Sequence, residues 1–114
     1  MSLPQPGRAI VDERKLRDYC LNLEHPRGRH KARVFASALG LTADDAEELR
    51  QALLSAARTV KAVAVDLDEY GQRYLIDFEL RTTVGRATVR SGWIVRSNEN
   101  FARFTTCWIL PGAT

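Results

Sequence analysis

The chain has 114 residues, of which 17 are lysine or arginine and 14 are aspartate or glutamate, for a formal net charge of +3. This length is typical of one domain with its own core, so we expect a single domain over residues 1–114. The sequence contains no run of about 18 apolar residues, which argues against a membrane span. It also shows no apolar segment of a secretory signal, so we expect a cytoplasmic protein.

The charge is unevenly distributed along the chain. Residues 1–40 hold eight Lys/Arg and four Asp/Glu, residues 41–80 hold four and nine, and residues 81–114 hold five and one. Because two basic segments flank an acidic one, we expect the folded chain to have one basic face and an acidic face opposite it. A basic face attracts nucleic acid by neutralising phosphates and releasing counterions. Arginine is also a common surface residue, so the pattern alone leaves both interpretations open.

The first half of the chain has the pattern of helices. We expect residues 1–10 to be flexible. Asp12 is placed to cap a helix over about residues 13–21. Pro26 and Gly28 then prevent that helix from continuing, because proline lacks the N–H and glycine is a poor helix former.

Two further helices are predicted before the strands begin. The second covers about residues 29–39 and stops at Gly40, the residue type that adopts the left-handed conformation at a helix end. The third covers about residues 43–60, where apolar residues recur at spacings of three and four. Thr42 and Asp45 have the spacing of a capping box at its start.

After residue 60 the apolar residues alternate with a period of two, which is typical of strands. Short turns between the runs favour an antiparallel meander. The predicted fold is therefore α+β, with three N-terminal helices packed on a four-stranded antiparallel sheet. The expected strands cover about residues 61–68, 72–81, 86–96 and 102–110.

The alternation assigns side chains to the two faces of the sheet. It predicts Val63, Val65 and Leu67 on the apolar side of the first strand, and it groups Thr106 and Trp108 with the apolar residues of the last strand. The opposite face would carry threonine and several arginines, a surface on which an RNA backbone can lie. A solvent-facing side of a sheet is also polar in proteins that bind no RNA. The outward-facing residues are Arg73, Asp77, Glu79, Arg81, Arg86, Thr88, Arg90, Ile94, Arg96, Arg103, Thr105, Cys107 and Ile109.

The motifs of several common sites are absent from the sequence. It contains no G-x-x-x-x-G-K-[ST], G-x-G-x-x-G, G-x-S-x-G or H-E-x-x-H. Cys20, His25 and His30 do not supply the four ligands of a structural zinc site. We therefore expect no metal and no cofactor. Cys20 and Cys107 are interpreted as reduced, buried thiols.

The stretch "LEHPRGRHKARVF", residues 23–35, is the strongest candidate for a functional site. Metal-independent RNA cleavage needs a general acid and base and positive charge on the phosphate. Histidine suits the first task because its ordinary pKa is about 6.5, and lysine and arginine suit the second. The predicted catalytic residues are His25, Lys31, Arg90 and Thr106, and the predicted phosphate or RNA contacts are Arg27, Arg29, His30, Arg33 and Thr105.

The chain also resembles a small bacterial family of uncharacterised domains. The resemblance runs from residue 9 onward and consists of a Tyr-x-Leu-Asn helix end, His-Pro-x-Gly, Lys-Ala, a Phe followed by Leu-Gly, Tyr-Gly-x-x-Tyr, Val-x-[ST]-x-Trp-Ile and a late threonine. In this chain the pattern falls on Tyr19, Leu21, Asn22, His25, Pro26, Gly28, Lys31, Ala32, Phe35, Leu39, Gly40, Tyr70, Gly71, Tyr74, Val89, Ser91, Trp93, Ile94 and Thr106.

That family is similar in layout and gene context to the barnase–EndoU–colicin–RelE group of toxin ribonucleases. The similarity implies that His25 and Lys31 act from the helices and that Arg90, Ser91 and Thr106 act from the sheet. It also implies an acidic antitoxin or immunity protein as a partner. The alternation, however, puts Ser91 and Thr106 on the face opposite Arg90.

The sequence therefore predicts two alternative functions, and a third that it supports less well. The first is a metal-independent endoribonuclease of bacterial toxin type, with RNA as substrate. The second is a non-catalytic module that binds nucleic acid or protein through a basic sheet face; the third is an antitoxin. Catalysis requires His25, Lys31 and a sheet-borne Arg or Thr to converge, and a His25 that packs against Tyr19 would count against it. The oligomeric state is left open.

Overall fold

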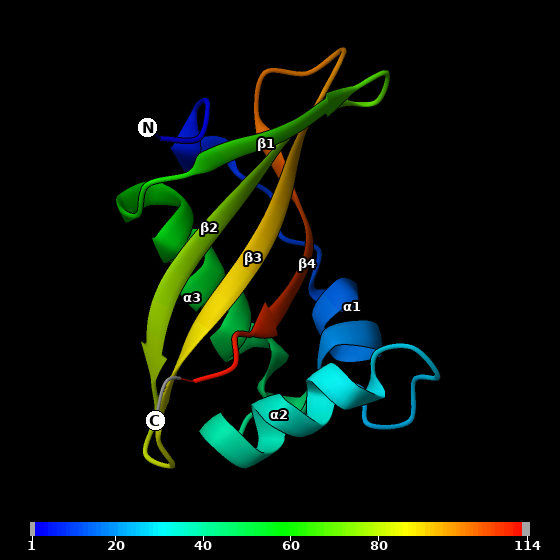
Figure 1. The fold of residues 1–114 in the computed structure, drawn as a ribbon, viewed down its shortest axis with the longest axis vertical. Helices are drawn as coiled ribbons and strands as arrows, with labels where there is room; N and C mark the ends of the chain where they lie inside the picture. The colour runs from blue at the N-terminus through cyan, green and yellow to red at the C-terminus, as the bar shows by residue number, and fades with distance from the viewer. Residues whose placement is uncertain (1, 113–114) are drawn as a thin grey trace.

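In the structure, a computed structural model that describes residues 2–112, all helices precede the sheet along the chain (Figure 1). This arrangement confirms the predicted α+β fold. No helix of the described residues has the length and apolar character needed to cross a membrane. The helical elements are η1 (Pro6–Arg8), α1 (Glu13–Lys15), η2 (Leu16–Cys20), α2 (Arg29–Leu39), η3 (Ala43–Asp45) and α3 (Ala46–Thr59). The strands are β1 (Val63–Asp68), β2 (Gly71–Arg81), β3 (Arg86–Arg96) and β4 (Ala102–Ile109).

The helix ends form as local chemistry dictates. Asp12 accepts a hydrogen bond from the backbone N–H of Arg14 at 3.0 Å. Gly40 ends α2 in the left-handed conformation, with φ of 68°. Thr42 and Asp45 form the predicted capping box before α3, with the Thr42 N–H donating to Asp45 Oδ2 at 2.9 Å. These caps satisfy backbone groups that a helix end leaves unpaired.

The first helical segment changes its winding after one turn. Residues 13–15 form α1, and residues 16–20 continue as the π-helix η2. The N–H of Leu21 accordingly donates to the carbonyl of Leu16, five residues earlier, at 2.8 Å. Single π turns of this kind occur often at functional sites. Here the π turn contains Tyr19, which contacts His25 and Lys31, and Cys20, which contacts Thr106 of β4.

The four strands lie in the order β1-β2-β3-β4, with every neighbouring pair antiparallel. One face of the sheet is covered by α3, while α1 and α2 lie beside β4 (Figure 1). Ile76, Val89, Trp93 and Phe104 are buried on the covered face. We call the opposite side of the sheet the outer face.

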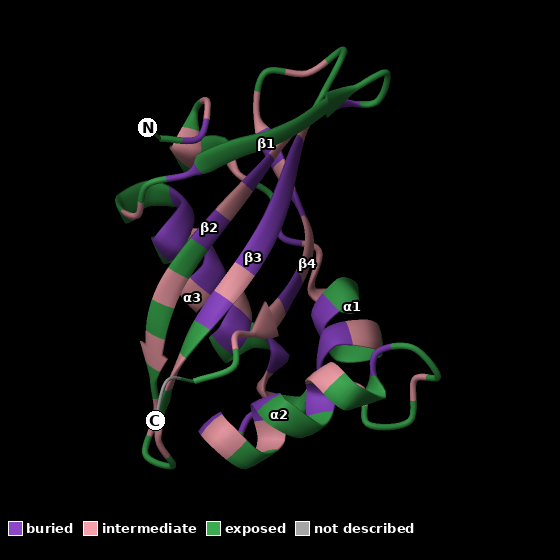
Figure 2. Ribbon diagram, in the orientation of Figure 1, coloured by how far each residue is buried: buried purple, intermediate pink, exposed green. Residues whose placement is uncertain are grey.

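The predicted burial of the β1 side chains is wrong. Val63, Val65 and Leu67 are all exposed, and Figure 2 shows that β1 is exposed along its whole length. β1 is an edge strand that pairs only with β2, and a β-bulge between Ala64 and Leu67 interrupts its alternation. Bulges on edge strands disfavour pairing with further chains.

Residues 2–10, which the sequence predicts to be flexible, make specific contacts with the rest of the chain. Leu3 is buried in the core. Ile10 bridges to β4, because its N–H donates to the Ala102 carbonyl at 3.0 Å and its carbonyl accepts from the Phe104 N–H at 2.8 Å. The N-terminal segment therefore covers the edge of β4.

Candidate nucleic-acid interface

His25 stabilises the turn between η2 and α2. Its Nδ1 accepts hydrogen bonds from the backbone N–H groups of Arg27 and Gly28, each at 3.0 Å. An Nδ1 that accepts is unprotonated, so the neutral ring carries its hydrogen on Nε2. The imidazole also packs edge-on against the Tyr19 ring, with centroids 4.7 Å apart. This is the contact that counts against His25 as a free general acid or base.

Gly28 lets this turn lie directly on η2. A Cβ at position 28 would come within 2.5 Å of the Tyr19 carbonyl oxygen. Gly28 itself is buried, and its carbonyl accepts from the Ala32 N–H at 3.0 Å. Any residue can adopt the φ of −90° at Gly28, so backbone conformation does not require glycine here. Glycine is required because the two backbones approach too closely to leave room for a Cβ.

Lys31 connects α2 to the sheet. Its Nζ lies 5.0 Å from the centroid of the Trp108 ring on β4 and 5.6 Å from that of Tyr19. A cation at this distance from an aromatic face is attracted by the quadrupole of the ring. Lys31 thus brings the helical part of the predicted site against β4, although its own ammonium group is held by the two rings.

The predicted face of Thr106 and Trp108 is wrong, because β4 contains a bulge. Gly92 pairs with Thr106, but Trp93 pairs with Phe104, so Thr105 is the extra residue. The extra residue reverses the alternation after Phe104. Thr106 and Trp108 therefore share the outer face with Arg90, which pairs with Trp108 across the strands. The bulge therefore brings the sheet-borne candidates Arg90 and Thr106 to the same face.

Two predicted sheet residues have structural partners. The Thr105 Oγ1 covers Gly92, where an added Cβ would lie 2.8 Å away. Ser91 is buried, and its Oγ donates to the Ile76 carbonyl and accepts from the Trp93 Nε1–H, both at 2.9 Å. The hydroxyl of Ser91 is therefore part of the core.

The two thiols meet where η2 packs on β4. Cys20 and Cys107 are free and fully buried, as the sequence predicts. The Cys20 Sγ lies 3.9 Å from the Thr106 Oγ1. Hydrogen bonding to Cys107, helped by Thr106 and the positive charge of Lys31, lowers the pKa of the Cys20 thiol to about 7. Burial raises the pKa of Cys107, so negative charge is favoured at Cys20.

The predicted basic sheet face is largely neutralised by neighbouring carboxylates. Arg90 donates from Nε and Nη2 to both oxygens of Asp77, each at 2.8 Å. Such a two-point pair uses the donors that a phosphate would need. Arg103 makes the same kind of two-point pair with Glu99, while Arg73 and Arg81 each make one longer contact, Arg73 with Asp68 at 3.5 Å and Arg81 with Glu79 at 3.4 Å.

Arg86 and Arg96 of β3 have no such partner among residues 2–112, and further unpaired basic residues lie close together on the turn before α2 and on its first turns. The side chains there are exposed, and no carboxylate of residues 2–112 lies within 4.0 Å of them. We call this set the α2 basic surface; it consists of Arg27, Arg29, His30 and Arg33. Sequence spacing had selected these residues, but only the structure distinguishes them from the paired arginines of the sheet.

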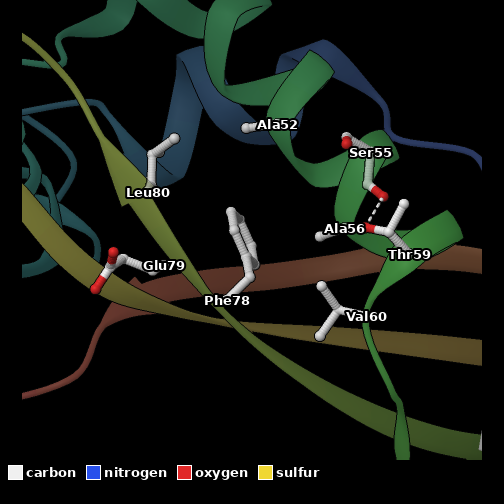
Figure 3. A pocket seen from close by; sticks show the side chains of 8 residues that line it. All are labelled: Ala52, Ser55, Ala56, Thr59, Val60, Phe78, Glu79 and Leu80. Carbon is white, nitrogen blue, oxygen red and sulfur yellow. Dashed lines mark hydrogen bonds between the residues drawn. The ribbon is translucent and has the colours of Figure 1, made fainter.

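A recess between α3 and β2 lies away from this surface. It measures about 250 Å³, and Phe78 and Val60 form its apolar walls (Figure 3). The Thr59 hydroxyl donates to the Ser55 carbonyl at 2.9 Å, as the figure shows. None of the predicted site residues lines the recess.

Comparison with known families adds one result. Residues 2–111 match the family described as "Domain of unknown function (DUF6883)". The chain belongs to the DUF6883 family. This agrees with the predicted membership of an uncharacterised family. No curated protein and no solved structure matches the chain.

The sequence did not predict every member of this site. Tyr19 and Trp108 were expected to be packing residues, yet they hold Lys31 between the helices and β4. Cys20 was expected to be a reduced, buried thiol, and its contact with Thr106 was not predicted. The sequence distance between a lysine and the aromatic residues that it contacts is not fixed. No local pattern in this DUF6883 chain therefore predicted the contact of Lys31 with Tyr19 and Trp108.

Proposed function

We propose that the chain binds single-stranded RNA through the α2 basic surface. The observation that supports this proposal is the contrast between two groups of arginines. Arg27, Arg29 and Arg33 are exposed without a carboxylate partner among the described residues, whereas Arg73, Arg81, Arg90 and Arg103 are each paired. The proposal keeps RNA as the ligand and moves its contact surface from the sheet to α2.

An unpaired guanidinium is suited to this task. It presents a rigid set of donors that matches phosphate oxygens, and it remains charged at every physiological pH. Arg29 and Arg33 are one helical turn apart, which places their Cβ atoms about 6 Å from each other on one side of α2. Three phosphate contacts on a single strand predict a slope of about −2 for log affinity against log salt.

Fluorescence anisotropy with a labelled single-stranded RNA tests the proposal. We expect the double variant R29A/R33A to lose about tenfold or more in affinity and to show a shallower salt slope. The matched control is R73A/R81A, which removes the same charge from the outer face of the sheet and should bind within about twofold of the wild type. An equal loss in both double variants would mean that only net charge matters, and no binding by the wild type would end the proposal.

A second candidate function is the metal-independent endoribonuclease of bacterial toxin type. The observation in its favour is that the helix-borne Lys31 lies 5.0 Å from the ring of Trp108, the β4 residue that pairs with Arg90 across the strands. Thr106 shares the outer face with Arg90 because of the β4 bulge. Against it, His25 keeps only Nε2 for proton transfer, and Arg90 is occupied by Asp77.

Substitution of His25 separates the two candidates. H25N retains an acceptor for the backbone N–H groups at the second and third following residues, as asparagine does in turns, but it cannot act as a general acid or base. Induced expression in a bacterial host, followed by growth and total RNA integrity, gives the readout. Growth arrest and RNA fragmentation in the wild type but not in H25N would support a ribonuclease; intact RNA in both would leave RNA binding without cleavage.

If the ribonuclease activity is present, the chain needs an inhibitor in its own cell. We infer that such a partner would be an acidic antitoxin or immunity protein that covers the α2 basic surface with carboxylates. Its association would then weaken steeply with salt. The R29A/R33A variant would lose both the inhibitor and the RNA.

A further inference from the structure

A groove lies between α2 and the end of the sheet at which β3 begins and β4 ends. Its volume is about 560 Å³, within the range of small-molecule sites. Most of its wall is apolar, with one guanidinium and one threonine hydroxyl, and no carboxylate side chain lines it among residues 2–112. The lining residues are Val34, Ala38, Arg86, Ala87, Thr88, Ile109, Leu110, Pro111 and Gly112.

The groove opens beside the α2 basic surface. Val34, which lines the groove and is exposed, directly follows Arg33 in α2. Lys31 precedes Val34 by three residues, so the two side chains lie on the same flank of the helix. Lys31 contacts Trp108, the neighbour of the groove residue Ile109. A strand that follows the α2 basic surface therefore passes the mouth of the groove.

The lining of the groove suits a flat, largely apolar group that belongs to an anionic ligand. Arg86 has no carboxylate within 4.0 Å among residues 2–112, so its guanidinium plane is free to stack. Proteins recognise single-stranded RNA by turning bases out of the strand, stacking them on arginine or aromatic side chains and bonding their edges. The exposed Thr88 supplies a donor and an acceptor for such an edge.

We propose that the groove holds one base of a single-stranded RNA whose phosphates lie on the α2 basic surface. This inference rests on the proposed function. It adds that one base turns away from the sugar–phosphate backbone and enters the groove. The apolar wall of Val34, Ala38 and Ile109 covers the faces of the base, and Arg86 stacks on it. The arrangement makes the chain recognise RNA rather than any polyanion.

Two oligonucleotides of equal length test the inference by anisotropy. One is a single-stranded RNA, and the other has the same sugar–phosphate backbone without bases. We expect the wild type to bind the RNA about tenfold more tightly than the abasic strand, the effect of one stacked base. In A38L, a leucine fills the groove, and RNA affinity should fall to the abasic level while abasic affinity stays unchanged. R86A should act in the same direction.

The matched control is Q51L, which adds leucine to an exposed position of α3, outside both the groove and the α2 basic surface. It should bind both strands as the wild type does, and circular dichroism checks that each variant is folded. Equal binding of both strands by the wild type, or unchanged RNA binding by folded A38L and R86A, would overturn the inference while leaving phosphate binding intact. Unchanged RNA binding by A38L and R86A is also the result expected if the groove binds a segment of a protein and not a base. Failure of the wild type to bind either strand would overturn the proposed function itself.

Discussion

The ammonium group of Lys31 lies 5.0 Å from the ring centroid of Trp108, and this contact ties the start of α2 to β4. K31M keeps the aliphatic chain and removes the charge. We expect it to lower the free energy of unfolding by about 1 kcal/mol through loss of the cation–π attraction. Urea unfolding followed by tryptophan fluorescence measures this. K61M is the control, because Lys61 is an exposed lysine that is not among the cation–π contacts of Lys31. An equal loss of unfolding free energy in both variants would contradict the role of Lys31.

His25 is expected to act first on the stability of the turn. H25A removes the acceptor of two backbone N–H groups and should lower the free energy of unfolding by about 1 kcal/mol. H25N restores an acceptor at the same place and should recover most of the loss. Thermal or urea unfolding of the three proteins gives the comparison. If H25N is as unstable as H25A, packing of the imidazole on Tyr19 is the dominant contribution.

Gly28 is expected to be sensitive to a single added methyl group. G28A would place a Cβ 2.5 Å from the Tyr19 carbonyl oxygen, so backbone must move. We expect a loss of about 1–3 kcal/mol in the free energy of unfolding, as for other overpacked sites. G7A is the matched control, because its Cβ would meet nothing within 4 Å. Similar stability of G28A and G7A would show that the turn tolerates displacement from η2.

The pair of Asp77 and Arg90 predicts a pH dependence of stability. Hydrogen bonds from Arg90 lower the pKa of the Asp77 carboxyl below its ordinary value. A lowered pKa in the folded state contributes stability that is complete above the unfolded value of about 4 and is lost as the pH falls through the folded value. D77N should therefore be less stable than the wild type at pH 7. The difference should shrink below about pH 4 in urea unfolding, and a constant difference would contradict the assignment.

D77N also tests the sheet as a binding surface. Once its carboxylate partner is removed, Arg90 becomes available to phosphate. If the outer face of the sheet contacts RNA, D77N should bind more tightly, and the salt slope should steepen by about 0.7. If RNA follows α2, as proposed, affinity should change by no more than the small long-range effect of one charge. The same anisotropy assay with R90A serves as the control.

Local chemistry accounts for what the sequence predicted correctly. The helix stops and starts at Gly40, Thr42 and Asp45 depend on interactions within a few residues, and they form as expected. The apolar stripe of α3 through Leu49 and Leu53 is buried as its spacing indicates. The order of helices and strands follows from the change of period after residue 60.

The errors lie where a side chain's surroundings depend on distant residues. A single extra residue at Thr105 turns Thr106 and Trp108 to the outer face, and alternation alone cannot show a bulge. The apolar residues of β1 remain exposed, because β1 is an edge strand and a bulge interrupts its alternation. Alternation predicts which side a residue faces and not whether another layer covers that side.

The sequence by itself determined the elements, their order and the positions of the basic residues, because these depend on local backbone preference and composition. The tertiary structure decided which charges remain free. Arg90 meets Asp77 across two strands, thirteen residues away in sequence, whereas Arg29 and Arg33 meet no carboxylate in the described part of the chain. Charge pairing acts over a few ångströms in space, so the same residue type is neutralised at Arg90 and left available on α2.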